Sequence, residues 1–297
     1  MTKIEEQAPE LKAKNLEVEQ KEYFSPKLSA NALFHFMREY SFLENAIEKM
    51  AFLPRYYPEN IKYLNLKRYG EQLTEWWVPM TCFCDIPLHQ ISHHAEGIDD
   101  SGYGKFGIAL NKKFGIDKGI QPIQYLNENS VNTKELSRAI NALLSGEVPD
   151  GAIFDSMSGN LLEHMRMVKP LSGTMPKTIN VDGKSVKKNI KKNFHDEHEW
   201  RYIPNIKVGE APLLLVDEDE ILAEKSFYYT DSLSMTKNGL LYFDVDDIRY
   251  IFVANTTSRN DLIKFIQKKR TGKRLNREEK DILISKIIVY DDLKEDW

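Results

Sequence analysis

The sequence contains little cysteine and no long apolar run. Only Cys82 and Cys84 occur among 297 residues, and on a strand they would share a face yet stand too close in sequence for an easy disulfide. We therefore expect a reducing, cytoplasmic location rather than a disulfide-bonded secreted domain. No stretch of about 20 apolar residues is present, and the opening residues lack the apolar core of a signal peptide, so we expect no membrane association.

Several common binding motifs are also absent. The chain has neither G-x-x-x-x-G-K-[ST] nor G-x-G-x-x-G, the usual P-loop and Rossmann signatures. The two cysteines and the histidines His89, His93 and His94 do not have the spacing of a structural zinc site. Their apolar neighbours favour cysteines that pack as small hydrophobic residues, so we predict no metal. A net charge of −4 argues against a protein that coats a polyanion.

What is present is the composition of a soluble globular protein, with 41% hydrophobic and 29% charged residues. Residues 1–27 are rich in Glu and Lys and are predicted to form a charged arm, either frayed or a weak helix that binds a partner. Residues 28–297 are predicted to form one α+β domain. Strands are expected at 33–36, 78–88, 103–110, 121–127, 212–219, 240–255 and 281–292, helices at about 42–50 and, in two pieces, at 132–168, and an irregular basic segment at 172–193.

Residues 195–201, HDEHEWR, place two carboxylates two positions apart. On a strand, neighbours on one face lie about 6.5–7 Å apart, so His195, Glu197, Glu199 and Arg201 would share a face. Such a pair suits a site in which one carboxylate stabilises a developing positive charge and the other accepts a proton. The alternative is a half-exposed strand whose charges form structural ion pairs with a neighbouring strand.

The E-x-E pair resembles the catalytic glutamate motif of ADP-ribosyltransferases. The resemblance implies a split mixed or antiparallel sheet with surrounding helices, and NAD as a substrate. It implies that Glu199 stabilises the oxocarbenium-like transition state and that Glu197 assists the acceptor, with Arg201 beside them as a cofactor-binding residue.

A second set of motifs spans more of the chain, from Leu33 to Pro204. It consists of FHF at 34–36, PMTCFCDIPL at 79–88, YGKFGI at 103–108 and DEHEWRYIP at 196–204, followed by DIRYIFV at 247–253. In these motifs and their order the chain is similar to the AbiGi family, abortive-infection (phage-resistance) proteins that are often labelled antitoxins. The loop between Pro87 and Tyr103 is longer than the family's pattern, which leaves open which of His89, His93 and His94 takes the family's histidine position.

The two resemblances together suggest how NAD would be held. In ADP-ribosyltransferases a histidine or arginine on the first strand binds the ribose and an aromatic ring packs on the nicotinamide, which implies these roles for His35 and Tyr103. Arg55 occupies the place of the downstream arginine of DarT-like, DNA-modifying enzymes. The simpler interpretations are a histidine and a tyrosine in an ordinary core and an arginine on a surface loop.

Two basic clusters, 184–192 and 268–274, could follow the phosphates of a nucleic acid. Lys184–Lys192 would lie near the predicted site and could receive an RNA or single-stranded DNA acceptor. A solvated surface is the alternative, and a protein acceptor is equally compatible with the sequence.

The sequence and the resemblances therefore predict a phage-defence protein and leave two mechanisms open. The first is an NAD-dependent ADP-ribosyltransferase that modifies RNA, DNA or protein as a toxin-like effector. The second is a non-catalytic antitoxin or sensor that binds a partner toxin or a phage protein.

Overall fold

The computed structural model describes residues 30–96, 102–145, 161, 163–181, 184–207, 210–212, 219–268 and 275–296. The predicted arm at 1–27, most of the strand expected at 212–219 and most of the basic cluster at 268–274 lie outside these residues. In the described part of the chain, no helix is both long enough and apolar enough to span a bilayer.

A mixed sheet organises the fold, in the order β16-β15-β7-β1-β6-β13-β8, with β3 also paired to β6. Within it only β15 and β16 are described as parallel, and the other pairs are antiparallel. The α+β prediction is confirmed. The strands are β1 (Ala32–Met37), β3 (Arg55–Asn60), β6 (Glu75–Cys84), β7 (Phe106–Asn111), β8 (Gln121–Pro122), β13 (Glu199–Tyr202), β15 (Ile248–Val253) and β16 (Ile287–Val289).

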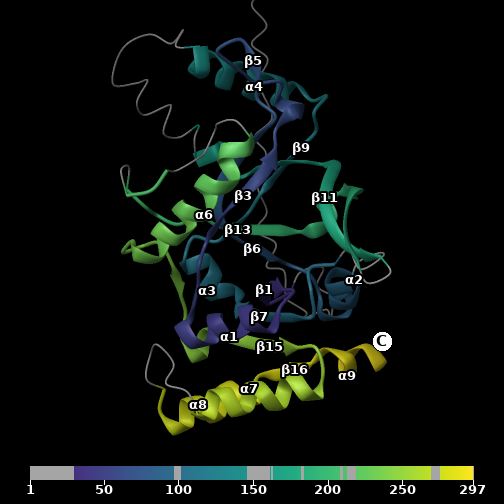
Figure 1. Ribbon diagram of the computed structural model, residues 1–297, viewed down its shortest axis with the longest axis vertical. Coiled ribbons are helices and arrows are strands. Elements are labelled where there is room, and N and C mark those ends of the chain that lie inside the picture. The colour runs from purple at the N-terminus through teal and green to yellow at the C-terminus, as the bar shows by residue number, and fades with distance from the viewer. Residues whose placement is uncertain are drawn as a thin grey trace, which may run out of the picture.

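Helices cover both faces of this sheet (Figure 1). Leu33 on β1 packs in one core cluster with α1 and α7, whereas Phe34, the next residue, packs in another with α2 and α9. This alternation is what the pleat of a strand buried on both faces requires. The helices are α1 (Tyr40–Lys49), α2 (Ile91–Glu96), α3 (Lys112–Asp117), α4 (Val131–Ser145), α6 (Asp219–Met235), α7 (Thr256–Lys268), α8 (Arg277–Ser285) and α9 (Tyr290–Glu295).

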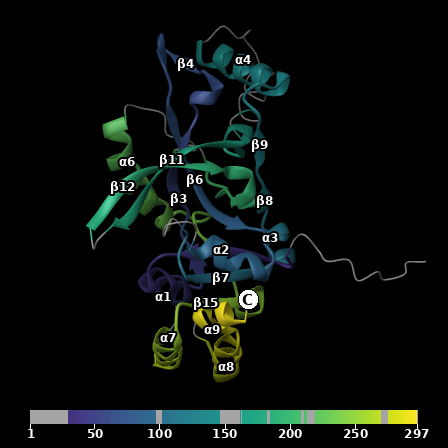
Figure 2. The same ribbon diagram turned by 90° about the vertical axis from the view of Figure 1, so that its right-hand side faces the viewer.

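A third core cluster lies where β6 begins, at the end of the molecule that carries α4, far from α7 and α8 (Figures 1 and 2). Trp76 and Val78 of β6 pack there with Ile140 of α4. Short paired strands complete the architecture. They are β2 (Ala51–Phe52) with β14 (Leu241–Tyr242), β4 (Lys67–Arg68) with β5 (Glu71–Gln72), and β9 (Gln124–Leu126) with β10 (Val168–Pro170).

The basic segment at 172–193 is not irregular, as predicted, but a hairpin of β11 (Ser172–Val181) and β12 (Lys184–Asn193). Residues with high strand propensity, such as Thr178, Ile179 and Val186, outweigh the lysines between them, and Asp-Gly at 182–183 is a strong hairpin signal. The hairpin projects from the body of the molecule (Figure 2).

The continuous strand predicted for 195–201 is also wrong in its first half. Phe194–Glu197 form a single 3₁₀ turn, and His198 adopts a left-handed conformation with φ of 45°. β13 therefore begins only at Glu199. Asn193 donates a side-chain hydrogen bond to Asp196 at 2.9 Å, a local bond of the kind that favours turns over strands. The strand predicted at 281–292 is also wrong in its first part, because residues 281–285 belong to helix α8 and Lys286 is the C-cap of that helix.

Two glycines in turns have positive φ: Gly104, before β7, with 105°, and Gly70, between β4 and β5, with 87°. Comparing them tests how closely the backbone packs at Gly104. A Cβ on Gly104 would lie 2.2 Å from the carbonyl oxygen of Met37, whereas a Cβ on Gly70 would meet nothing within 4 Å. We expect Gly70→Ala to lower the free energy of unfolding by about 1–2 kcal/mol through φ alone. Gly104→Ala should cost about 2 kcal/mol more, since the β1 backbone must shift. Urea denaturation of both variants measures the difference, and equal losses would contradict the close approach.

Candidate functional site

Six charged side chains from four strands and one turn meet in the interior beside β13. They form what we call the carboxylate network: Glu59, Lys169, Lys192, Glu197, Glu199 and Arg201. Arg201 is fully buried, and the three carboxylates are between 5% and 8% exposed. Three carboxylates and three cations balance, which is the condition under which buried charge is tolerated.

Glu199 lies at the centre of the network. Register places it opposite Cys84 on β6, and its carboxylate accepts from Arg201 Nε at 2.6 Å and from Lys169 Nζ at 2.9 Å. Burial alone would raise the pKa of Glu199, but Arg201 and Lys169 outweigh it and hold that pKa far below its ordinary value. Glu199 is therefore ionised at neutral pH, with both oxygens bound.

Glu197 binds the same lysine as Glu199, Lys169. Lys169 Nζ lies 2.8 Å from one carboxylate oxygen, and Lys192 Nζ lies 2.7 Å from the other. The Tyr103 hydroxyl donates to Glu197 and accepts from Lys192 at 2.7 Å. Burial opposes ionisation, yet the two lysines lower the pKa of Glu197 overall. A general base needs a pKa near the working pH, so neither glutamate is tuned for that role.

Arg201 connects the network to the rest of the fold. Its Nε binds Glu199, its Nη2 binds Glu59, and its Nη1 donates to the main-chain carbonyl of Arg166 at 2.9 Å. Burial raises the pKa of Glu59 despite the guanidinium beside it. With each of its nitrogens bound, Arg201 acts as an internal counter-ion.

The structure brings four of the six predicted site residues together: Glu197, Glu199, Arg201 and Tyr103. It does not bring His35 to them. Phe34, Cys84 and Glu199 are in register across β1, β6 and β13. Because successive residues of a strand alternate, His35 faces the opposite side of the sheet from Glu199.

His35 is surrounded by aromatic rings. Its ring centroid lies 4.6 Å from that of Phe52 and 5.7 Å from that of Phe83, and Nδ1 donates to the Cys82 carbonyl at 2.7 Å. Burial lowers the pKa of His35 to about 4, with a smaller contribution from the charge of Arg55. These contacts are those of a neutral histidine in a core.

Arg55 begins β3 and is exposed. Its guanidinium carbon lies 5.2 Å from the centroid of the Phe42 ring on α1, a cation–π geometry. Arg55 thus packs against α1 at the surface, which agrees with the simpler interpretation of Arg55 as a surface arginine.

Sequence reasoning missed Glu59 and Lys169 and assigned Lys192 to an acceptor-binding surface. Glu59 and Arg201 are 142 positions apart, and Lys169 and Glu199 are 30 apart. No local spacing could reveal such pairs. The sequence signal for a buried charge network was that Glu199 and Arg201 alternate with the aromatic residues Trp200 and Tyr202.

Comparison with known proteins supplies a family relationship. Residues 50–254 match the family model described as "Putative abortive phage resistance protein AbiGi, antitoxin". A curated protein from Lactococcus lactis subsp. cremoris, "Abortive phage resistance protein AbiGi", is 59% identical over 251 residues, which are 84% of this chain and 100% of that protein. No solved structure matches the chain.

The network predicts a large cost for removing one of its charges. Glu199→Gln leaves Arg201 and Lys169 buried without their shared partner, and we expect a loss of about 3–5 kcal/mol in the free energy of unfolding at pH 7. Glu135→Gln is the control, because Glu135 pairs with Arg138 on the exposed surface of α4 and should cost less than about 1 kcal/mol. Urea titration measures both. Similar costs for the two variants would show that the network does not stabilise the fold.

His35 predicts a separate pH dependence. Because its folded pKa lies below that of the unfolded chain, the unfolded state takes up the proton first as pH falls from about 6.5 to about 4. Stability should fall through that window by up to about 3 kcal/mol, and His35→Gln should remove this part of the slope. His93→Gln, at an exposed position on α2, should leave the slope unchanged in the same denaturation series. A slope that survives His35→Gln would refute the assignment.

Proposed function

The chain belongs to the AbiGi family, and we propose that it is a phage-defence protein that works as an antitoxin, by binding a partner toxin rather than by catalysis. The family's description and that of the relative from Lactococcus lactis supply the phage-defence context. The observation that carries the binding role is the exposed face of α6.

One face of α6 presents large apolar side chains to solvent. Phe227, Tyr228 and Met235 are 81%, 70% and 83% exposed. At 3.6 residues per turn, these three residues and the exposed Asp231 fall within an arc of about 100°. We call them the α6 face.

The opposite side of the helix is already used. Leu233 is fully buried with Tyr56 of β3, and Thr230 accepts a hydrogen bond from the Tyr56 amide at 3.2 Å. A helix that is apolar on both sides is typical of one that is buried on both sides. Aromatic side chains and Met are the residue types enriched where proteins bind one another.

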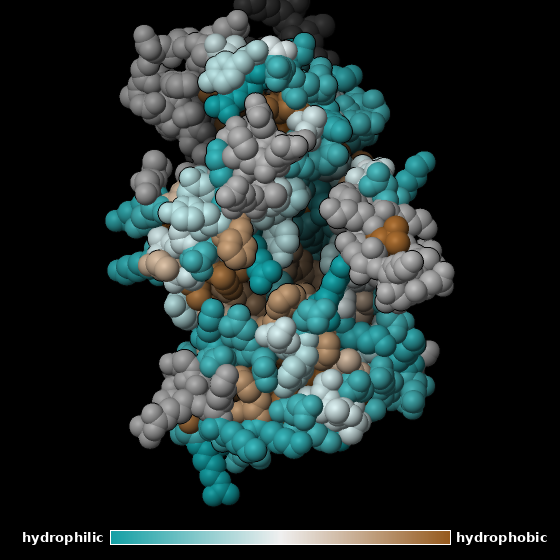
Figure 3. All heavy atoms as spheres, viewed as in Figure 1, coloured by the Kyte–Doolittle hydropathy of each residue, from teal (hydrophilic) through white to brown (hydrophobic). Residues whose placement is uncertain are grey.

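Elsewhere in the described part of the chain, large exposed apolar side chains such as Tyr69 and Val131 lie on separate elements. Hydrophilic residues cover most of the surface in view in Figure 3, with smaller apolar areas between them. Single exposed apolar residues need no explanation, but neighbouring ones on a single helix face mark an interaction site. The proposed occupant is the folded partner toxin, with an apolar patch that receives Phe227 and Met235.

The state of the predicted catalytic residues also favours binding. Glu197 and Glu199 are each held by two cations of the chain itself, so a substrate would have to displace buried ion pairs. A transferase would also need a ribose-binding group on their side of the sheet, and His35 faces away.

An NAD-dependent ADP-ribosyltransferase is the second candidate. One observation favours it: Tyr103, Glu197, Glu199 and Arg201 converge although they come from separate parts of the chain. NAD as substrate, and RNA, DNA or protein as acceptor, remain predictions. For an acceptor on the hairpin, Lys191 is exposed, but Lys192 is engaged with Glu197 and Tyr103.

Co-expression with a candidate partner toxin from the same organism tests the antitoxin proposal. Wild type should rescue growth, whereas Phe227→Ser with Met235→Ser should not, and affinity for the purified toxin should fall by about 100-fold. Tyr69→Ser is the control, because Tyr69 is 90% exposed on the β4–β5 turn, away from α6. Since all three positions are exposed, the variants should remain folded.

Two results would overturn the antitoxin proposal. One is full rescue by the α6 double variant. The other is toxicity of the wild-type chain alone, together with transfer of label from NAD to a macromolecule in cell lysate. The second result would establish the transferase instead, above all if Tyr103→Phe abolished the labelling.

A further inference from the structure

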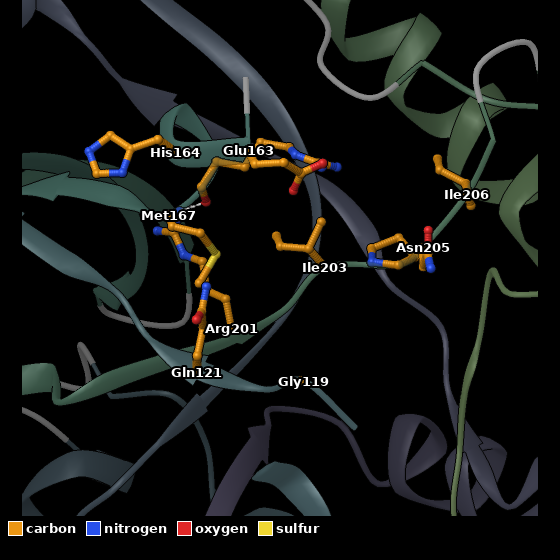
Figure 4. Close-up of a pocket in the computed structure, with 11 residues that line it drawn as sticks. Gly119, Gln121, Glu163, His164, Met167, Arg201, Ile203, Asn205 and Ile206 are labelled. Atoms are coloured by element: carbon orange, nitrogen blue, oxygen red, sulfur yellow. Dashed lines mark hydrogen bonds and ion pairs between the residues drawn. The ribbon is translucent and has the colours of Figure 1, made fainter. Parts of the chain in front are cut away.

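A cavity of about 540 Å³ is lined in part by Arg201 but not by Glu59, Glu197 or Glu199, and it belongs to neither function considered above. Three segments line it: the approach to β8, the residues before β10, and the chain that leaves β13. Figure 4 shows Met167, Arg201 and Gln121 along one side and Asn205 and Ile206 across from them. The volume lies in the range of small-molecule sites, about 300–1,000 Å³.

Arg166 makes this cavity unusual. The residue is only 2% exposed and lines the pocket. Its Nη2 pairs with Glu163, but Nε and Nη1 are buried and have no hydrogen-bond partner among the described residues. A buried guanidinium with unsatisfied donors is costly, because the lost contacts with water are not replaced.

The other arginine at the pocket does not share this property. Arg201 has each of its guanidinium nitrogens bound, to Glu199, to Glu59 and to the Arg166 carbonyl. Of the two arginines, only Arg166 therefore has guanidinium donors without a partner among the described residues. A guanidinium matches the oxygens of carboxylate and phosphate groups, which accept two of its N–H donors at once.

The remaining walls indicate the rest of the ligand. Met167 and Ile206 are buried apolar residues of the lining, and Gln121 and Asn205 are exposed amides at its opening. The lining is thus mixed, with apolar residues beside polar and charged ones, and such a mixture suits an organic molecule that carries an acidic group better than a bare ion.

We propose that this cavity binds a small organic molecule through a phosphate or carboxylate group that accepts hydrogen bonds from Arg166. Glu163 acts as the resident competitor for the guanidinium. Its side chain is 62% exposed, so it can turn into solvent when the ligand enters. The apolar part of the ligand rests on Met167 and Ile206.

The experiment uses the full chain and three probes that share a ring: phenyl phosphate, benzoate and, as the neutral control, benzyl alcohol. Isothermal titration at constant ionic strength should show saturable binding of at least one of the two anions and none of the alcohol. The anion that binds more tightly identifies the ligand's acidic group. Binding of neither anion, or equal binding of all three probes, overturns the proposal.

Variants test whether the anion binds at Arg166. Arg166→Met should weaken the anion at least tenfold, whereas Arg138→Met, at an exposed arginine of α4, should change nothing. Glu163→Gln should tighten binding about tenfold by releasing Nη2, and because Glu163 is exposed this variant tests the site even if Arg166→Met fails to fold. Unchanged affinity in Glu163→Gln, or equal affinity of wild type and a folded Arg166→Met, refutes the assignment.

Discussion

The burial of the Arg201 guanidinium is the constraint from which the interior around β13 follows. A fully buried cation must be matched, and Glu199, two residues earlier on the same strand, supplies one carboxylate. Glu59 of β3 also binds Arg201, and Lys169 of β10 also binds Glu199. Together they join strands of the main sheet to the short β9–β10 pair, and Lys192, which binds Glu197, adds the base of the hairpin.

The same arrangement explains why an E-x-E motif can mislead. In sequence, Glu197 and Glu199 have the spacing of a catalytic pair. In the fold, Glu197 ends a 3₁₀ turn and Glu199 begins β13, with the left-handed residue His198 between them. Each carboxylate is neutralised by cations of the chain itself. Their depressed pKa values are then signs of structural ion pairing, which perturbs titration as strongly as catalysis does.

The sequence was sufficient for the elements whose pattern is local. The short apolar segment around Leu33 and the helical spacing of Phe42, Ala46 and Ile47 predicted β1 and α1 correctly. The hairpin was missed because lysines obscured its β-branched residues. Glu59 and Lys169 were missed because their partners are distant in sequence, and the opposed directions of His35 and Glu199 depend on a register that no single strand encodes.

The reach of the network along the chain has a kinetic consequence. Tyr103 meets Glu197 across 94 positions, and Glu59 meets Arg201 across 142. Contacts of such long range close late and slow the search for the native state. A nascent chain that has left the ribosome only as far as residue 150 therefore carries Glu59 without its counter-ion. We therefore expect β1, β6 and β7, which are synthesised first, to remain partly hydrated until the last third of the chain has been synthesised and packs against them.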